Sequence, residues 1–169
     1  GGGGGGTAYY PTPKVIISAY TISADPVYAG DTFTLSLTLT NTSTDEAIRN
    51  LAISFADETG NVLPADNGSN SLYIENMEMG ESVTREIAFQ SAPDTEPKAY
   101  TLDVAFSYDG VKSKQAYTPT SAITIPVLQR IRVKIDNPTV YDEAWVGNEC
   151  AMYIALYNMG KATIYNCLV

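Results

Sequence analysis

Carboxylates, hydroxyls and two cysteines are the groups that could do chemistry in this 169-residue chain, because the sequence contains no histidine. Histidine is the usual general base near neutral pH and the commonest ligand of transition metals. Its absence excludes Ser-His-Asp and Cys-His mechanisms within the chain. The 19 Asp and Glu residues leave a glycosidase-type carboxylate pair open. Most of them fall in turns or on the polar faces of expected strands, so we expect solvated surface charge, no catalytic residues and no cofactor.

Calcium is the metal for which the sequence offers the best candidate site. Residues 66–70, DNGSN, place hard oxygen donors in a polar loop. The run lacks the spaced carboxylates and the terminal bidentate acid of a recognised calcium loop. We therefore favour a plain Asx-type turn, with calcium binding as the alternative.

The two cysteines, Cys150 and Cys167, occupy positions at which the chain's internal repeat predicts inward side chains. Each is expected to begin one of two successive strands, so the rise of about 3.3 Å per residue places them roughly 15 to 20 Å apart. That separation exceeds the reach of a disulfide. We predict two free thiols, buried as small core residues.

Tyrosine is abundant, with twelve residues. The exposed ones among them, such as Tyr9, Tyr10, Tyr108 or Tyr117, could form an aromatic surface for a sugar or a protein partner, and we single out Tyr108 and Tyr117 as candidate contacts. The alternative is that tyrosine suits half-buried strand positions. On this alternative, Tyr100 donates a hydrogen bond back to the chain at the corner of a sandwich.

Strands are predicted almost throughout residues 13–127. Residues 32–40 alternate strictly between apolar and polar types, and residues 50–55 and 100–108 repeat this period. Asp109-Gly110 is typical of a hairpin turn. Arg85 interrupts the apolar face of residues 83–89, which indicates an edge or bulged strand. About seven short strands without a useful helical period predict an all-β, immunoglobulin-like β-sandwich.

An internal repeat extends this fold beyond residue 127. Residues 27–41, VYAGDTFTLSLTLTN, align with residues 144–158, AWVGNECAMYIALYN, so that Gly30 meets Gly147 and Asn41 meets Asn158. After one deletion, Asn50 meets Asn166. A repeat of this kind predicts tandem modules. Residues 128–169 supply about three strands, too few for an independent core, so we expect the incomplete start of a second immunoglobulin-like module.

The first twelve residues differ in composition from everything that follows. Six glycines lead into a segment containing Pro11 and Pro13. Such a composition is typical of a flexible linker that stiffens as it reaches a domain. We expect a natural linker over residues 1–12, and a remnant of purification is the alternative.

Charge is distributed unequally between the two predicted modules. Residues 13–127 hold 6 basic and 15 acidic residues, whereas residues 128–169 hold 4 of each. Phosphate backbones and anionic membranes both require clustered Lys and Arg, so we expect neither as a partner. The chain also lacks a run of eighteen apolar residues, so we expect this segment not to insert into a membrane.

Four motifs carry a resemblance to a known family. PKVIISAYTISADPVYAGDTFTLSLTLTNTS, SNSLYIENMEMGES, EPKAYTLDVAFSYDG and AITIPV resemble the immunoglobulin-like repeats of bacterial surface proteins. More narrowly, the chain is similar to S-layer-type repeat proteins and to the cell-adhesion-related domain of bacterial extracellular proteins, which also occurs beside glycosidase modules. The family pattern contains no catalytic residues to carry over.

The resemblance implies a setting and a role. It implies a non-enzymatic module at the cell surface or in the cell wall, serving in adhesion, spacing or assembly. Its partners would be other surface proteins or cell-wall polysaccharide, with self-association through an unpaired strand edge as a further possibility. The alternative is a carbohydrate-binding accessory module of a larger secreted enzyme.

Overall fold

A computed structural model describes residues 12–140, 143 and 145–168 of the chain. Within these residues the chain forms β-strands and one short 3-10 turn, η1 (Ala65–Asn67). The strands are β1 (Val15–Ile22), β2 (Val27–Tyr28), β3 (Thr32–Asn41), β4 (Ile48–Ala56), β5 (Val62–Pro64), β6 (Ser71–Met77), β7 (Ser82–Ser91), β8 (Lys98–Gly110), β9 (Ala116–Tyr117), β10 (Thr120–Leu128), β11 (Val133–Ile135), β12 (Thr139–Val140), β13 (Met152–Tyr153) and β14 (Leu156–Asn158). The part of the chain that the structure describes contains no helix with the length and apolar character needed to span a bilayer.

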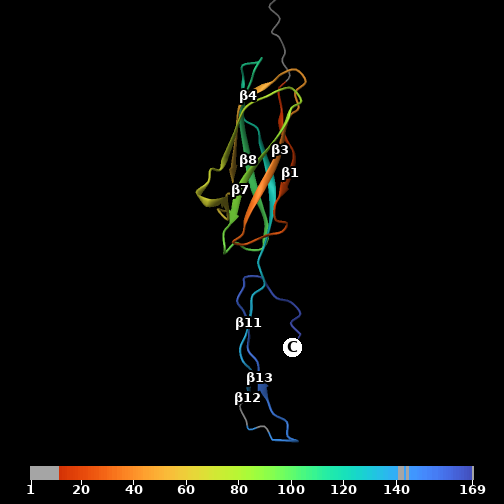
Figure 1. Ribbon diagram of the computed structural model, residues 1–169, viewed down its shortest axis with the longest axis vertical. Helices are drawn as coiled ribbons and strands as arrows, with labels where there is room; N and C mark the ends of the chain where they lie inside the picture. The colour runs from red at the N-terminus through yellow and green to blue at the C-terminus, as the bar shows by residue number, and fades with distance from the viewer. Residues whose placement is uncertain (1–11, 141–142, 144, 169) are drawn as a thin grey trace, which may run out of the picture.

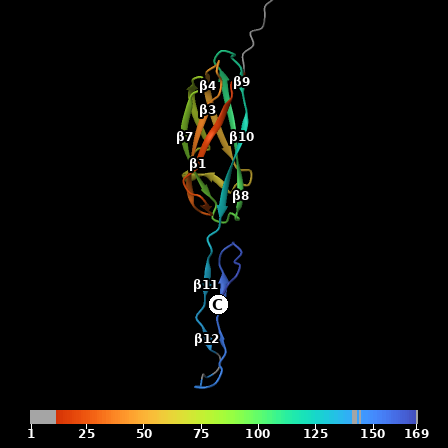
Figure 2. The ribbon, with the colours of Figure 1, turned by 90° about the vertical axis from the view of Figure 1, so that its right-hand side faces the viewer.

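Two sheets pack face to face to form the larger unit, as Figures 1 and 2 show from perpendicular directions. One has the strand order β1-β3-β7-β5, and the other has the order β2-β10-β8-β4-β6 with β9 attached to β8. Their neighbouring strands are antiparallel, except that β2 and β10 pair in parallel. This arrangement confirms the predicted immunoglobulin-like sandwich.

Strict alternation in the sequence builds the core between the sheets. Along β3, every second residue is buried and the residues between them are at least partly exposed. β4 and β8 contribute alternate side chains to the core from the facing sheet. Phe89 of β7 lies between the two layers, with its ring centroid 6.0 Å from that of Phe33 and 5.7 Å from that of Phe55. The alternate residues that the sequence assigns to the inside are therefore the ones that water does not reach.

The opposite face of β1, β3 and β7 carries short hydroxyl side chains. The hydroxyls of Thr38 and Thr84 lie 3.0 Å apart, and the hydroxyl of Thr40 lies 2.8 Å from those of both Ser82 and Ser18. Cross-strand hydroxyl pairs of this kind add modestly to sheet stability. The predicted polar face is confirmed, and it presents hydroxyls rather than aromatic rings.

Arg85 lies on a strand edge, as its place in the sequence indicates. β5 pairs with β7 only at Phe89–Ser91, so the preceding part of β7 pairs with β3 alone among the described residues. Arg85 is exposed there, and its guanidinium donates to the carbonyl of Thr84 at 2.9 Å. An unpaired edge lets the charged group leave the apolar face and reach water.

Tyr100 forms the predicted tyrosine corner at the beginning of β8. The Tyr100 side chain is 3% exposed, and its hydroxyl donates a partly buried hydrogen bond to the backbone carbonyl of Glu96 at 3.0 Å. Burial raises the pKa of the phenol, and the negative charges of Glu96 and Asp57 add to the effect. The bond fixes the loop that leads from β7 to β8.

Removing this hydroxyl tests the corner. We expect Tyr100→Phe to lower the free energy of unfolding by about 1 kcal/mol, because the Glu96 carbonyl loses a partly buried donor. Urea unfolding with an unchanged m-value measures the difference. Tyr73→Phe is the matched control, because the exposed Tyr73 hydroxyl donates to Asn50 in open solvent. Equal losses in the two variants would contradict a structural role for the corner.

The smaller unit, residues 132–168, repeats the first hairpin of the sandwich. Val133 pairs with Asn158 as Val15 pairs with Asn41. The tandem pattern in the sequence therefore corresponds to a repeated backbone register. Figure 1 shows this unit beyond the end of the sandwich at which β10 leads into β11.

Both cysteines are exposed, whereas the sequence predicts that they are buried. Cys150 and Cys167 are free, and both are exposed. Their counterparts in the sandwich, Phe33 and Leu51, are covered by the facing sheet. No second sheet covers residues 132–168 within the described part of the chain. The predicted burial of the thiols is therefore wrong.

Candidate functional site

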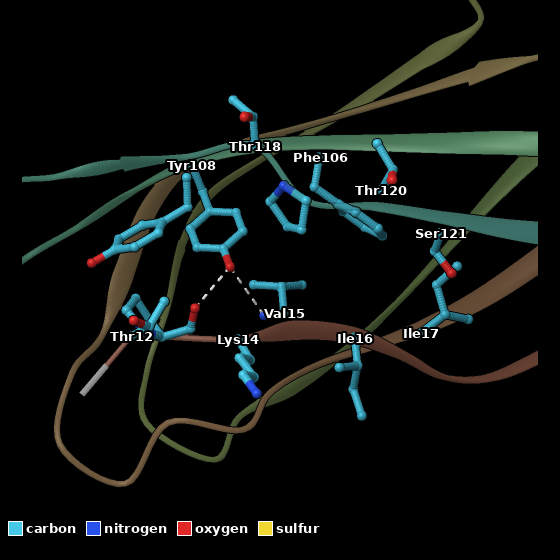
Figure 3. A pocket seen from close by; sticks show the side chains of 13 residues that line it. Thr12, Lys14, Val15, Ile16, Ile17, Phe106, Tyr108, Thr118, Thr120 and Ser121 are labelled. Atoms are coloured by element: carbon cyan, nitrogen blue, oxygen red, sulfur yellow. Dashed lines mark hydrogen bonds between the residues drawn. The ribbon is translucent and has the colours of Figure 1, made fainter.

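A hollow of about 460 Å³ lies along the seam between the two sheets. The strands that bound it are β1 and the start of β10, which face each other without hydrogen-bonding (Figure 3). Among the described residues, β1 pairs with β3 alone, and the outer edge of β10 is paired only at Val127 and Leu128. The seam is thus where the sandwich presents both an opening and unpaired strand edges.

The walls of the seam hollow are mainly apolar. The lining residues are Thr12, Pro13, Lys14, Val15, Ile16, Ile17, Phe106, Tyr108, Tyr117, Thr118, Pro119, Thr120 and Ser121. Lys14 is the one charged residue among them. The described lining contains no carboxylate, and its hydroxyls and apolar walls suit contact with an uncharged ligand.

Backbone bonds on both sides fix the shape of the hollow. The Lys14 carbonyl accepts the backbone N–H of Thr42 at 2.9 Å, which attaches the entering chain to β3. On the opposite wall, the Pro119 carbonyl accepts the backbone N–H of Phe106 at 2.9 Å. The two walls are therefore parts of the two sheets, and the hollow is as fixed as the sandwich itself.

Tyr108 lies at the inner end of the hollow, where it joins the two walls. It is 3% exposed, and its hydroxyl donates to the Pro13 carbonyl at 2.9 Å (Figure 3). The backbone N–H of Val15 lies 3.4 Å from the same oxygen. Burial raises the pKa of this phenol above its ordinary value. Because the bonds connect β8 to the start of β1, we call this arrangement the Tyr108 latch.

The expectation that Tyr108 is exposed is wrong. Tyr108 continues the series Leu102, Val104 and Phe106, all of which point into the core. The place of Tyr108 in this series of alternate, inward residues is the sequence feature that indicates burial. It outweighs the proximity of Tyr108 to a predicted turn. A buried ring that stacks on another tyrosine offers little surface to a sugar.

Tyr117 is the half-buried member of the pair. Its ring stacks on that of Tyr108 with 5.6 Å between centroids and 29° between planes. Its hydroxyl makes long contacts of 3.4 Å with Ser113 and Gln115. The structure thus brings the two candidate tyrosines together, in one stack rather than as a platform. Tyr9 and Tyr10 lie outside the described residues.

Most of the described acidic residues lie exposed or half-buried in turns and on polar strand faces, as expected, and Glu46 departs from this placement. Asp57 accepts hydrogen bonds from the backbone N–H groups of Thr59, Asn61 and Val62 at 2.9 to 3.0 Å. Burial acts to raise the pKa of Asp57, but the hydrogen bonds from Thr59 and from the backbone N–H groups outweigh it and lower the pKa. Asp57 is therefore a structural carboxylate that holds the loop between β4 and β5.

The pH dependence of stability follows from this lowered pKa. Asp57 stabilises the fold above its ordinary pKa, and the contribution is lost as the pH falls below about 4. We expect Asp57→Ala to cost about 1 kcal/mol at neutral pH and nothing measurable in strong acid, where the native carboxyl is protonated. Urea unfolding over a pH series measures both. The exposed Glu58→Ala is the control, and a cost of Asp57→Ala that persists in strong acid would count against this assignment.

Glu46 is the exception to the surface placement of acids. It is 0% exposed, and one carboxylate oxygen accepts the backbone N–H of Ser113. The other oxygen, Oε2, is buried without a partner. The carboxylate packs against Gly110, where an added Cβ would collide with both Glu46 and Ser113. Gly110 is therefore required for space. The predicted hairpin is present, because β8 pairs antiparallel with β9, but its turn lies at residues 111–114 rather than at Asp109-Gly110, which end β8.

The described residues contain no cluster of three or more His, Cys, Asp or Glu side chains that could hold a metal ion. In the loop considered for calcium, the backbone N–H of Gly68 bonds to the Ala65 carbonyl at 2.8 Å. The side-chain amide of Asn70 donates to the Phe55 carbonyl at 3.1 Å. Loop closure thus accounts for Asn70, and calcium binding, the alternative to a plain Asx-type turn, stays untested.

Comparisons with known proteins extend to the fold alone. No protein-family model matches the chain, and no curated protein matches it. Among solved structures, native alpha-2-macroglobulin of Escherichia coli, from domain MG7 to its C-terminus, is similar with a TM-score of 0.51 and 15% identity, over 76% of this chain and 19% of that one. A cohesin module from a family 33 glycoside hydrolase of Clostridium perfringens gives a TM-score of 0.46 and 9% identity, over 66% of this chain and 96% of the module. The first of these two likenesses agrees with an immunoglobulin-like β-sandwich.

Proposed function

We propose that the chain is a non-catalytic module of a bacterial extracellular surface protein, in which it acts as a load-bearing spacer for adhesion or assembly. The observation that carries the proposal is the polarity of both outer sheet faces. The exposed large apolar residues of the described sandwich are scattered over separate strands and turns: Ile16, Tyr20, Leu63, Tyr73, Met79 and Leu128. Sugar binding on a sheet face would require a contiguous aromatic patch.

The path of the chain through the sandwich supports a spacer. Val15 and Thr120 line the seam hollow at one end, whereas Ile22 and Pro126 border a depression at the other. β1 and β10 therefore run in the same direction along the seam, and the chain enters at one end of the sandwich and leaves at the opposite end (Figure 2). Tension between these points shears the ladders of β1 with β3 and β10 with β8, so that many hydrogen bonds resist together.

Contacts at the exit stiffen the passage to the smaller unit. Arg130 bonds to the Asp31 carboxylate at 3.0 Å, and its guanidinium lies 4.3 Å from the centre of the Tyr28 ring. Lys161 donates to the Asp94 carbonyl at 2.9 Å. Each exposed ion pair adds little stability by itself. Together they restrict the angle between the units, which a spacer requires.

The proposal is tested by a binding screen combined with scattering. We expect the chain to bind none of a panel of bacterial wall polysaccharides. We also expect Arg130→Ala to broaden the distribution of interatomic distances that small-angle X-ray scattering measures. Lys134→Ala is the control, since Lys134 pairs with Asp136 within the smaller unit. Tight binding of a polysaccharide, or a distribution that Arg130→Ala leaves unchanged, would overturn the spacer.

One observation favours a carbohydrate-binding accessory module as the second candidate. The seam hollow combines apolar walls, several hydroxyls and the partly exposed ring of Tyr117. Such a hollow suits a single sugar unit better than the flat sheet faces do. Polysaccharide binding that Tyr117→Ala abolishes, with the fold retained, would establish this candidate in place of the spacer.

A further inference from the structure

A second depression, of about 480 Å³, lies along the seam at the end of the sandwich where β1 finishes. Its lining residues are Tyr20, Thr21, Ile22, Asp25, Thr124 and Pro126. Tyr20 is 45% exposed, and Asp25 is exposed as well. Asp25 is the one charged residue in the described lining. The depression is therefore a concave site with one aromatic ring and one negative charge.

The lining offers three kinds of contact to a ligand. A tyrosine ring such as that of Tyr20 attracts a cation to its face. The Asp25 carboxylate accepts charge-assisted hydrogen bonds from a cationic donor. Ile22 and Pro126 are half-buried, and they supply apolar surface along which an aliphatic stem can lie. A long side chain that ends in a cation matches all three contacts.

A tyrosine and an aspartate already hold a cation together at another place in this chain. The guanidinium of Arg130 lies 4.3 Å from the centre of the Tyr28 ring, and it bonds to the Asp31 carboxylate at 3.0 Å. The Arg130 side chain remains 60% exposed in this arrangement. The pair of residue types therefore holds an arginine without burying it.

The smaller unit contains a second example with lysine. The ammonium of Lys134 lies 5.6 Å from the centre of the Tyr157 ring and 3.0 Å from the Asp136 carboxylate. Tyr20 and Asp25 are a third tyrosine–aspartate pair, brought together by the depression that both of them line. In the described part of the chain, no Lys or Arg side chain pairs with this carboxylate or lies over this ring.

The charge of the surrounding sandwich favours a cationic ligand. Residues 13–127 hold 6 basic and 15 acidic residues. An excess of negative charge raises the local concentration of cationic groups and speeds their encounter with the surface. The depression then selects among them by its ring and its carboxylate, which the general charge cannot do.

We infer that the depression at Tyr20 and Asp25 binds an arginine side chain of a partner protein. Arginine is favoured over lysine because a planar guanidinium can stack on a ring and pair with a carboxylate at the same time, as Arg130 does. The guanidinium lies over Tyr20 and donates to Asp25, and its stem lies along Pro126. This binding site goes beyond the spacer function. The spacer rests on the path of the chain, so it stands whether or not the depression binds arginine.

An NMR titration of the isotope-labelled full chain tests the inference. The probe is the capped tripeptide acetyl-Gly-Arg-Gly-amide, compared at matched ionic strength with the same peptide carrying citrulline. Citrulline keeps the length and the planar end group of arginine but has no charge. We expect the arginine peptide to shift the backbone amides of residues 20–25 and of Thr124, and to bind at least about threefold more tightly than the citrulline peptide. A lysine peptide should bind less tightly than the arginine peptide.

Matched variants separate the depression from the general surface. Tyr20→Leu and Asp25→Asn should each weaken binding of the arginine peptide about threefold, and the double variant about tenfold. Tyr73→Leu and Glu75→Gln are the controls, because both residues are exposed on the outer face of β6. Glu75→Gln removes the same charge as Asp25→Asn. The two controls should leave binding unchanged.

Several outcomes would overturn the arginine site. Equal binding of the arginine and citrulline peptides would show that charge is not recognised, and shifts spread over the whole acidic surface would show attraction to net charge alone. An affinity that the double variant of Tyr20 and Asp25 leaves unchanged would place the ligand elsewhere. A lysine peptide that binds as tightly as the arginine peptide would contradict the choice of arginine. The arginine peptide causing no shift at all would also overturn the site.

Discussion

Phe89→Ala should lower the free energy of unfolding by about 3 to 5 kcal/mol, the largest effect that we expect from a single side chain. Phe89 is 1% exposed and touches Phe33 in its own sheet and Phe55 in the facing sheet. Its removal leaves a cavity between the layers that the hydrogen-bonded strands cannot close. A loss of this size consumes much of the 5 to about 15 kcal/mol that stabilises an ordinary domain.

A neighbouring residue supplies the control for Phe89. Gln90 lies on the same strand with its side chain on the exposed face. Gln90→Ala should change the free energy of unfolding by no more than about 0.5 kcal/mol. Thermal and urea unfolding measure both variants. A difference between them below about 1 kcal/mol would mean that the rings do not hold the two layers together.

Tyr108→Phe should open the Tyr108 latch and cost about 1 to 2 kcal/mol, because the Pro13 carbonyl loses a buried donor. The variant should also expose the backbone of β1 to hydrogen exchange before the rest of the sandwich. Tyr117→Phe is the matched control, since the Tyr117 hydroxyl makes only long contacts. Hydrogen exchange that is the same in both variants would contradict the latch.

The same tyrosine predicts a loss of stability at high pH. Burial raises the pKa of Tyr108 in the folded chain, so folding favours the protonated phenol. The stabilisation is fully present below the unfolded pKa of about 10 and is lost as the pH rises through the folded pKa. Tyr108→Phe should therefore lose less stability than the natural chain as the pH rises above about 10.

Alternation predicted the sandwich because each core strand buries every second residue. Apart from Asn41 at the end of β3 and Gly110 at the end of β8, the inward residues of these strands are apolar, so fold and core followed from the sequence. The break of register at Ser18 in β1 and the parallel pairing of β2 with β10 were not predictable from alternation. Both depend on how distant strands meet, which periodicity does not encode.

The candidate site was predicted in part. The rings of Tyr108 and Tyr117 do contact each other. The expected exposure of Tyr108 was wrong because it did not take account of the alternation of inward and outward residues along β8. Pro13 and Lys14 were missed, since each contributes a backbone carbonyl, which residue type does not reveal. The burial of Cys150 and Cys167 was wrong because inward parity produces burial only where a second sheet covers the strand.

Single-molecule pulling tests the load-bearing account most directly. With Cys150 and Cys167 replaced by serine, handles at residues 14 and 128 load the β1–β3 ladder in shear. Handles at residues 14 and 42, which are joined at one end of that ladder, peel it bond by bond. The account predicts that the first geometry withstands a several-fold higher force at the same loading rate and that Tyr108→Phe lowers it. Equal forces in the two geometries would contradict a sandwich built to carry tension between its ends.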